Sequence, residues 1–146
     1  MRLAILAAMT ALLAACSGET AKTTAEDHTT TEAVAENTRV AATLIYADWC
    51  SSCKIIEPKI DVVKEGGSID GVEWVTLDYT ARDADAFFAS ADELGIGEAI
   101  RDQLGGDVIT GILLLVDIDT KKVVADLRKE LSPEELRSAI EAAAAS

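Results

Sequence analysis

The chain has 146 residues, a length that suits one ordinary domain. Its 13 Lys and Arg residues against 26 Asp and Glu residues give a formal net charge of −13. This charge excludes a general nucleic-acid binder, which needs a basic face to neutralise phosphates, and argues against docking on an anionic lipid surface. A hydrophobic fraction of 49% is enough for a packed core and too high for a wholly disordered chain.

Residues 1–15 are typical of a secretory signal peptide. Arg2 is their one charged residue, and the apolar run that follows is shorter than the roughly 20 residues that a membrane-spanning helix needs. Residues 13–16, Leu-Ala-Ala-Cys, resemble the lipobox of bacterial lipoproteins. The resemblance implies that Cys16 carries a lipid on its sulfur and becomes the amino terminus, and Ser17 after it favours sorting to the outer membrane. The alternative is an ordinary buried N-terminal helix.

Residues 16–38 are expected to form a lipidated Cys followed by a flexible linker. After Cys16 this segment is rich in Thr, Ala and Glu and has no Leu, Ile or aromatic residue, so it cannot bury enough apolar surface to fold. His28, the only histidine, falls within it. The folded domain that we expect over residues 39–146 therefore has no histidine for a base or a metal site.

The remaining chain alternates between strand and helix patterns. Strands are expected at 40–47, 72–78, 108–116 and 121–127, and helices at 51–65, 83–94, 98–104 and 132–145. The apolar run at 108–116 indicates a central strand covered on both faces. This order predicts an α/β fold in which helices flank a central mixed β-sheet, with the last two strands antiparallel because the turn between them is short.

The chemistry-bearing motif is Cys-Ser-Ser-Cys at the junction of the first strand and helix. A Cys-x-x-Cys beside a βαβ pattern is the sequence sign of a thioredoxin-like redox site. With Cys50 at the start of the helix, Cys53 lies one turn further on the same face, and the two sulfurs can form a disulfide with little backbone movement. The free N–H groups and the positive end of the helix dipole stabilise a thiolate at this place.

Residues 40–145 resemble the thioredoxin superfamily, specifically in the Trp-Cys-x-x-Cys-Lys stretch that starts at Trp49 and in Pro58, five residues after the second cysteine. The stretch Tyr-Ala-Asp-Trp-Cys is similar to the C-terminal, periplasmic domain of the bacterial transmembrane disulfide reductase. The resemblance implies a thioredoxin-like fold, with Cys50 as the exposed nucleophile and Cys53 as the buried resolving cysteine. Trp49 would form a wall of the site.

The cysteine pair has two other interpretations. Half a zinc site is disfavoured because zinc takes four ligands, and the expected domain offers two cysteines and no histidine. A purely structural disulfide is disfavoured because so short a loop constrains the unfolded chain little. We therefore expect no resident metal and no cofactor.

The sequence departs from the family at the segment before the central strand. Thioredoxins carry a cis-proline there, and we align Thr110, preceded by Ile109, with that segment. Ile109 and Thr110 join Trp49 and Asp48 as candidate supporting residues of the site. In the family this proline shapes the groove for the partner and keeps metals away from the cysteines. Its replacement leaves partner recognition open, and leaves open a soft metal such as Cu(I) on the reduced pair.

Two further departures concern proton transfer and an insertion. The family's buried Asp corresponds here to Leu44, so proton exchange with Cys53 needs another group. Asp48 and Glu57 are candidates, although for each the interpretation as an exposed acid is favoured. The segment 80–106 is longer than in a minimal thioredoxin, and we expect either a lid near the site or a surface insertion.

Together these features predict a monomeric thiol–disulfide oxidoreductase in the bacterial envelope. It would be anchored by lipid through Cys16, face the periplasm, take electrons from a membrane donor and reduce or exchange disulfides in partner proteins. Nucleic acid is not an expected partner. The alternative is a metal-handling or non-catalytic binding module on the same fold.

Overall fold

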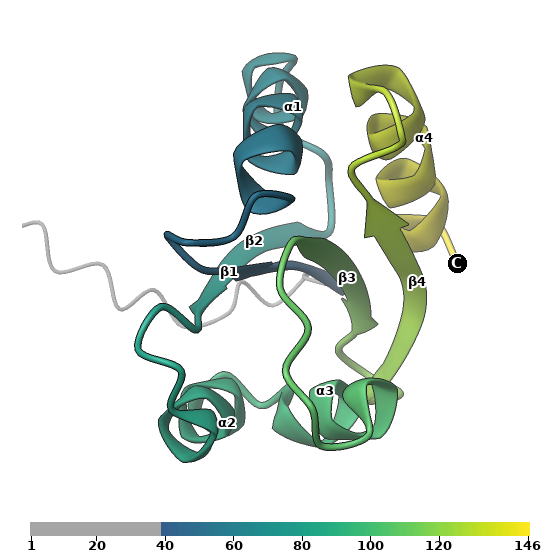
Figure 1. The fold of residues 1–146 in the computed structure, drawn as a ribbon. Helices are drawn as coiled ribbons and strands as arrows, with labels where there is room; N and C mark the ends of the chain where they lie inside the picture. Colours follow the sequence, from purple (N-terminus) through teal and green to yellow (C-terminus); the bar gives the residue numbers. More distant parts are fainter. Residues whose placement is uncertain (1–38) are drawn as a thin grey trace, which may run out of the picture. The chain divides into compact units, whose positions relative to one another are not determined.

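The computed structural model describes residues 39–146; the predicted signal peptide, Cys16 and the linker lie outside the described residues. Four strands form one mixed sheet in the order β2-β1-β3-β4 (Figure 1). In chain order they are β1 (Val40–Tyr46), β2 (Val72–Asp78), β3 (Ile112–Asp117) and β4 (Lys122–Arg128). The pair β1–β2 is parallel, and the pairs β1–β3 and β3–β4 are antiparallel. This confirms the predicted mixed sheet with an antiparallel final pair.

Two layers of helices cover the sheet. On one face lie α1 (Cys53–Glu65) and α4 (Pro133–Ala144), and on the other lie α2 (Ala84–Glu93) and α3 (Gly97–Leu104) (Figure 1). Alternate residues of β1 serve the two layers: Ala41 and Ile45 pack with α2 and α3, whereas Leu44 packs with α1 and α4. Strands β1 and β3 are buried on both faces of the sheet, which explains why their sequences are continuous apolar runs. The result is a thioredoxin-like α/β fold.

The segment 80–106 forms the second helical layer. Phe87, Ala91, Ile96 and Ile100 from this segment are at most 2% exposed and belong to the core on that face of the sheet. Neither a lid nor a surface insertion, the two forms that the sequence suggests, describes it. The sequence hides this because the apolar residues of two short helices are spread over mixed faces.

Strand β3 begins later than the sequence indicates. The apolar pattern starts at residue 108, but the strand starts at Ile112, because Gly111 has a φ of +80° that a strand does not accommodate. The N–H of Gly111 still donates to the carbonyl oxygen of Ile45 over 2.7 Å. This hydrogen bond ties the preceding loop to the end of β1.

The helix limits follow local signals. Helix α1 continues through Pro58, as the resemblance implies. Helix α4 starts with a capping box, in which the Ser132 hydroxyl accepts from the Glu135 N–H over 3.2 Å and the Glu135 carboxylate accepts from the Ser132 N–H over 2.8 Å. The predicted start of this helix is therefore confirmed.

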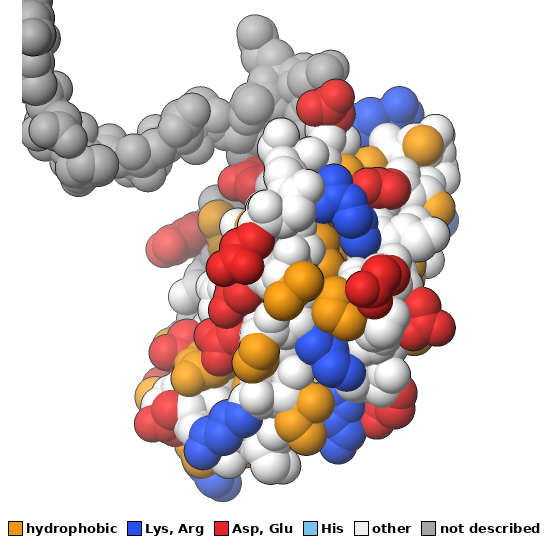
Figure 2. Space-filling model, turned by 90° about the horizontal axis from the view of Figure 1, so that it is seen from above, with side chains coloured by type: hydrophobic (Ala, Val, Ile, Leu, Met, Phe, Trp, Pro, Cys, Tyr) orange, Lys and Arg blue, Asp and Glu red, His pale blue; other side chains and the backbone are white. Residues whose placement is uncertain are grey.

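Figure 2 views the molecule from the side of α1 and α4, where acidic, basic and apolar side chains are interspersed. Ile55 and Val62 of α1 are the large apolar side chains exposed along that helix. Between residues 39 and 146, none of the helices has the length and apolar character that crossing a membrane requires.

Candidate active site

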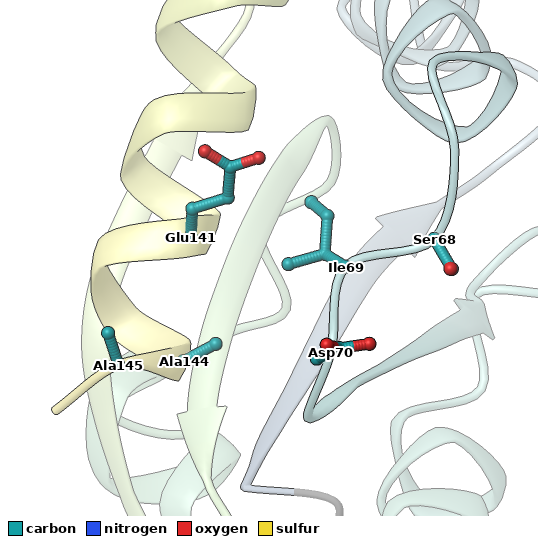
Figure 3. Close-up of a pocket in the computed structure, with 6 residues that line it drawn as sticks. All are labelled: Ser68, Ile69, Asp70, Glu141, Ala144 and Ala145. Atoms are coloured by element: carbon teal, nitrogen blue, oxygen red, sulfur yellow. The ribbon is translucent and has the colours of Figure 1, made fainter.

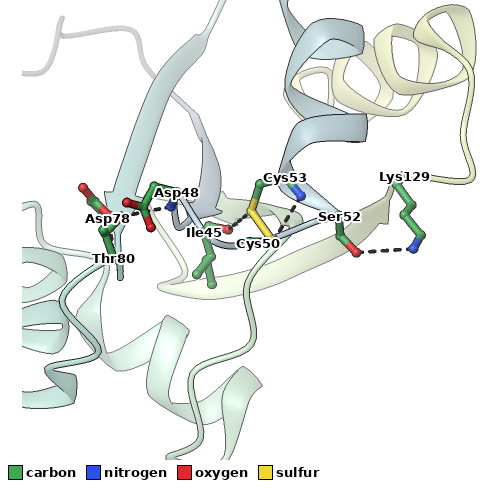
Figure 4. The surroundings of a disulfide bond; sticks show 8 residues. All are labelled: Ile45, Asp48, Cys50, Ser52, Cys53, Asp78, Thr80 and Lys129. Carbon is green, nitrogen blue, oxygen red and sulfur yellow. Dashed lines mark hydrogen bonds between the residues drawn. A yellow bond between two sulfur atoms is a disulfide. The ribbon is translucent and has the colours of Figure 1, made fainter.

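The cysteine pair lies at one end of the sheet, where four chain segments meet. The carboxyl ends of β1, β2 and β4 and the start of β3 share this end because β2 is parallel to β1 and β3 is antiparallel to both neighbours. The segments that follow or precede these strand ends, at residues 47–52, 79–83, 108–111 and 129–132, surround the cysteines. Figure 4 shows side chains from three of these segments around the sulfurs.

Cys50 and Cys53 form a disulfide, with their Cα atoms 5.3 Å apart. Cys53 is fully buried, and Cys50 is 5% exposed. The order of burial that the resemblance implies is therefore present, but Cys50 is recessed and does not project from the surface. A partner sulfur can reach Cys50 only by entering the space between the surrounding loops.

The start of α1 favours a negative charge on Cys50. The backbone N–H of Cys53 donates to the Cys50 sulfur over 3.1 Å. Ser52, the N-cap residue, makes no capping hydrogen bond with its side chain, and the first turn of α1 holds no acidic residue. The positive end of the helix is therefore free to stabilise a thiolate once the disulfide is reduced. The Cys53 sulfur instead lies 3.7 Å from the carbonyl oxygen of Ile45, an acceptor that favours a neutral thiol.

Trp49 forms a fixed wall beside the disulfide. Its indole N–H donates to the carbonyl oxygen of Thr80 over 3.1 Å, and the Arg82 guanidinium lies 4.1 Å from the ring centroid. Tyr79 meets the ring edge-on, with 6.4 Å between centroids. The side chain is nevertheless 42% exposed, so it also offers an apolar surface to a partner.

Asp48 contributes to the site through its backbone. Its N–H donates to the Thr80 hydroxyl over 3.1 Å, while its side chain is exposed. Thr80 is in turn fixed by its own N–H, which donates to the Asp78 carboxylate over 2.7 Å. Sequence reasoning missed Thr80 and Asp78; an Asp two residues before a Thr at a strand end is the signal of an Asx turn that marks them.

Gly111 is the residue that backs onto the disulfide, one position beyond Thr110, which aligns with the family's proline. A Cβ atom on Gly111 would lie 3.1 Å from the Cys50 sulfur and 3.2 Å from the Cys53 nitrogen, and closer still to the Ser52 Cβ. Ile109, 46% exposed, and the half-buried Thr110 directly precede it. The loop therefore brings bare backbone against the sulfurs and leaves Ile109 as an exposed apolar side chain near them.

Lys129 follows the edge strand β4 and approaches the cysteine pair from that edge of the sheet. Its ammonium donates to the Ser52 hydroxyl over 3.3 Å (Figure 4). The carbonyl oxygens of Lys129 and Leu131 both accept from the ammonium of Lys59 on α1, over 2.5 and 2.8 Å. Lys59 thus fixes the loop that carries Lys129. Sequence reasoning missed both lysines, because no local pattern marks a contact between segments about 70 residues apart.

The acids considered for proton transfer have different surroundings. Leu44, at the place of the family's buried Asp, is 6% exposed within the apolar cluster under α1 and α4. Glu57 is exposed on α1, as is Asp48 before the helix. Proton transfer by either acid stays a prediction. Within residues 39–146, no three or more His, Cys, Asp and Glu side chains are grouped as a metal site would need.

A hollow of about 370 Å³ is lined by Ser68, Ile69, Asp70 and residues of α4 (Figure 3). It lies between the start of β2 and the end of α4, at the end of the sheet opposite the cysteines. This hollow therefore does not include the cysteine pair.

No protein-family model matches the chain, and no curated protein matches it in sequence. Among solved structures, a point mutant of thioredoxin from Halobacterium salinarum NRC-1 is similar at a TM-score of 0.46 and 20% identity, over 76% of this chain and 80% of that one. Trxlp from Edwardsiella tarda EIB202 is similar at a TM-score of 0.46 and 17% identity, over 70% of this chain and 82% of that one. The strand order and the disulfide at the start of α1 give residues 39–146 a thioredoxin-like fold, suited to a thiol–disulfide redox role.

Proposed function

We propose that the chain is a protein thiol–disulfide oxidoreductase that reduces or exchanges disulfides in partner proteins through Cys50 and Cys53. The observation that carries the proposal is the unequal pair at the start of α1. Cys50 is the member with exposed surface and receives the Cys53 N–H, whereas Cys53 is sealed from solvent. A structural disulfide needs no such difference between its two sulfurs.

The reaction begins with the reduced pair. The Cys50 thiolate attacks one sulfur of the partner disulfide, the partner S–S bond breaks, and the departing partner thiolate takes a proton from solvent. Cys53 then loses its proton and its sulfur attacks the Cys50 sulfur. The mixed disulfide breaks, the second partner sulfur leaves as a thiol, and the pair is oxidised. Two electrons have passed from the pair to the partner.

An insulin-reduction assay with dithiothreitol as the electron source tests this proposal. The wild-type chain is expected to accelerate insulin reduction, and Cys50→Ser and Cys53→Ser are each expected to fall to the uncatalysed rate. When reduced Cys53→Ser is mixed with oxidised insulin in the absence of dithiothreitol, it should accumulate a mixed disulfide on Cys50 that mass spectrometry detects, because the resolving sulfur is absent. Cys16→Ser is the matched control and should keep full activity in solution.

Two results would count against an exchange enzyme: a wild-type chain without activity, or a Cys50→Ser variant as active as wild type. The first would favour a non-catalytic binding module on this fold. The reduction potential of the pair gives the direction of electron flow. A value near the roughly −270 mV of thioredoxin would indicate a reductant, and one near roughly −120 mV would indicate a strong oxidant.

The proposal includes a place in the cell. We place the chain in the bacterial envelope, anchored by lipid through Cys16, facing the periplasm and supplied with electrons by a membrane reductase. The support is the lipobox resemblance of residues 13–16 and the apolar segment before it. In a bacterial host, the wild-type chain should fractionate with membranes and Cys16→Ser should not. Equal fractionation of the two would contradict lipid anchoring.

A further inference from the structure

Two basic side chains approach the disulfide from opposite edges of the sheet. Arg82 belongs to the segment after β2, and Lys129 to the segment after β4. In the strand order β2-β1-β3-β4 these are the two edge strands, and the central strands β1 and β3 lead to the cysteine pair and to Gly111. The disulfide therefore lies between the two cations. Figure 4 shows Lys129 on one side of it and Thr80, from the segment of Arg82, on the other.

Each cation contacts a residue that lies within two positions of Cys50 in the chain. The Arg82 guanidinium lies on the ring of Trp49, and its backbone has a φ of +57°, a left-handed conformation that costs free energy for a residue other than glycine. The Lys129 ammonium donates to the Ser52 hydroxyl, and the Lys59 ammonium holds the loop of Lys129 by donating to its backbone carbonyl oxygen. Contacts on both sides thus position the two charges relative to the reactive sulfur.

The ion pairs within residues 39–146 involve other basic side chains and not these two cations. Arg101, Arg128 and Arg137 form ion pairs with acidic side chains, at Asp92, Asp126 and Glu141. Within the described residues 39–146, no ion pair joins Arg82 or Lys129 to a carboxylate, although Asp48, Asp83 and Glu130 lie in the segments around the cysteines. Both side chains can therefore pair with an acidic side chain of a partner.

We propose that Arg82 and Lys129 select protein partners that carry an acidic side chain beside the disulfide to be reduced. The inference rests on the proposed function and names its substrate class. A carboxylate on either side of the partner disulfide would pair with Arg82 or Lys129 and bring the partner sulfur toward Cys50. Trp49 and Ile109 would contact apolar side chains of the partner. The negative charge of the whole chain repels acidic partners at a distance, so this selection acts only at close range.

Two cyclic disulfide peptides test the inference. They are identical except that the residues flanking each Cys are Glu in one and Gln in the other. The full chain, reduced beforehand and kept in a neutral detergent, is mixed with either peptide at low salt. Acid quenching, alkylation and mass spectrometry then follow the loss of the Cys50 and Cys53 thiols. We expect the Glu peptide to react about two- to fivefold faster for each cation engaged, the size of an exposed ion pair.

Variants assign the effect to the two cations. Lys129→Gln and Arg82→Gln should each lower the rate ratio of the Glu peptide to the Gln peptide, and the double variant should abolish the preference. Lys122→Gln, at the far end of β4, removes the same unit of charge and should leave the ratio unchanged. Lys129→Arg and Arg82→Lys, which keep the charge, should keep most of the preference and show that the loss is not one of folding.

The outcomes separate this inference from the proposed function. Equal rates with both peptides in the wild-type chain would overturn the inference and leave the exchange activity intact. A fall in the ratio as large in Lys122→Gln as in Lys129→Gln would assign the effect to overall charge and would also overturn it. Oxidation by neither peptide would overturn both the inference and the proposed function.

Discussion

Gly111 allows the loop before β3 to pass directly against the Cys50 sulfur. Its φ of +80° and the short distances that a Cβ atom would make to Cys50 and Cys53 are two separate reasons for glycine at this place. Because the loop contributes only backbone here, the entrance to the sulfur is shaped by its neighbours Ile109 and Trp49. The reactivity of one sulfur thus depends on a residue 61 positions away in the chain.

Gly111→Ala and Gly106→Ala form a matched pair for this argument. Both glycines have positive φ, but a Cβ on Gly106 meets nothing within 4 Å. Gly106→Ala should lower the free energy of unfolding by about 1–2 kcal/mol through backbone strain alone. Gly111→Ala should add an overpacking cost of about 1–3 kcal/mol. Urea unfolding of the oxidised proteins measures both. Equal losses would contradict the close approach to the disulfide.

The sequence was sufficient for the residues that lie together in the chain. Trp49, Cys50 and Cys53 could be predicted because the spacing of a helix start determines how they are placed. Arg82 and Lys129 could not be assigned to the site, and Thr110 was predicted where Gly111 contacts the cysteines. Arg82, Lys129 and Gly111 all come from the ends of other strands. Which strand ends meet depends on the order of the strands in the sheet, and no local pattern encodes that order.

At the scale of single elements, the helix and turn signals are local and were predicted well. Helix α4 begins at a Ser-Pro-Glu-Glu sequence that supplies a cap, a proline in the first turn and two acids near the positive end of the helix dipole. The backbone N–H of Glu134 itself lowers the pKa of the Glu134 carboxyl, with a smaller contribution from the Ser132 side chain. A chain segment with such complete signals folds locally as its sequence indicates.

Replacing a serine with alanine should have opposite effects on stability at the N-cap of α4 and inside the helix. Ser132→Ala removes the cap and should lower the free energy of unfolding by about 1 kcal/mol. Ser138→Ala, at an exposed position inside the helix, should raise it by a few tenths of a kcal/mol, roughly, because alanine has the higher helix propensity. Chemical denaturation of the two variants and wild type measures both. A change of the same sign in both would contradict the capping box.

The turn between β3 and β4 gives a pH dependence. The Asp117 carboxylate accepts from the Thr120 N–H over 2.7 Å, which lowers the pKa of Asp117; the Thr120 side chain, the Asp119 N–H and the charge of Arg39 act in the same direction. A carboxyl whose pKa is lower in the folded state contributes stability above its unfolded pKa of about 3.9. That contribution is lost as the pH falls through the lower pKa of the folded state.

Asp117→Asn should therefore reduce the loss of stability as the pH falls below about 4, because the variant has no proton to bind at this position. Asp119→Asn is the control in the same turn, since Asp119 is exposed and its side chain is not the acceptor. Thermal unfolding across this pH range compares the two. A pH dependence of Asp117→Asn identical to that of wild type would show that the turn hydrogen bond does not contribute.

At the scale of the whole molecule, the disulfide closes a very short loop. Its cysteines are three positions apart, so the bond restricts the unfolded chain by about 2 kcal/mol at most. The stability of the fold therefore comes mainly from the two apolar layers on either side of the sheet. Both the oxidised and the reduced forms should be folded. This is what a protein that cycles between oxidised and reduced states requires.

Reduction of the wild-type chain should accordingly lower the free energy of unfolding by about 2 kcal/mol or less while leaving a cooperative transition. Urea unfolding with and without a reductant measures the difference. Cys53→Ser, which cannot form the bond, should show no dependence on the reductant. Unfolding of the wild-type chain on reduction alone would contradict a redox cycle on a stable fold.

The alternating patterns predicted the α/β class and the elements, but not the arrangement of the layers. Segment 80–106 is a core layer because Phe87 and Ile100 pack on the sheet from two separate helices. Only the pairing of β1 with both β2 and β3 creates the face that these side chains cover. Long-range pairing of this kind is a property of the whole fold.

Within residues 39–146, the strand order leaves β2 and β4 with one unpaired side each, and such edges can add a strand from another molecule. On β2 the side chains at this edge include Glu73 and Asp78, and on β4 they include Lys122 and Arg128. A second copy joining β2 to β2 would bring carboxylates together, and charged side chains would likewise oppose growth at β4. These charges on the two edge strands therefore oppose edge-to-edge aggregation, even where many copies are crowded together.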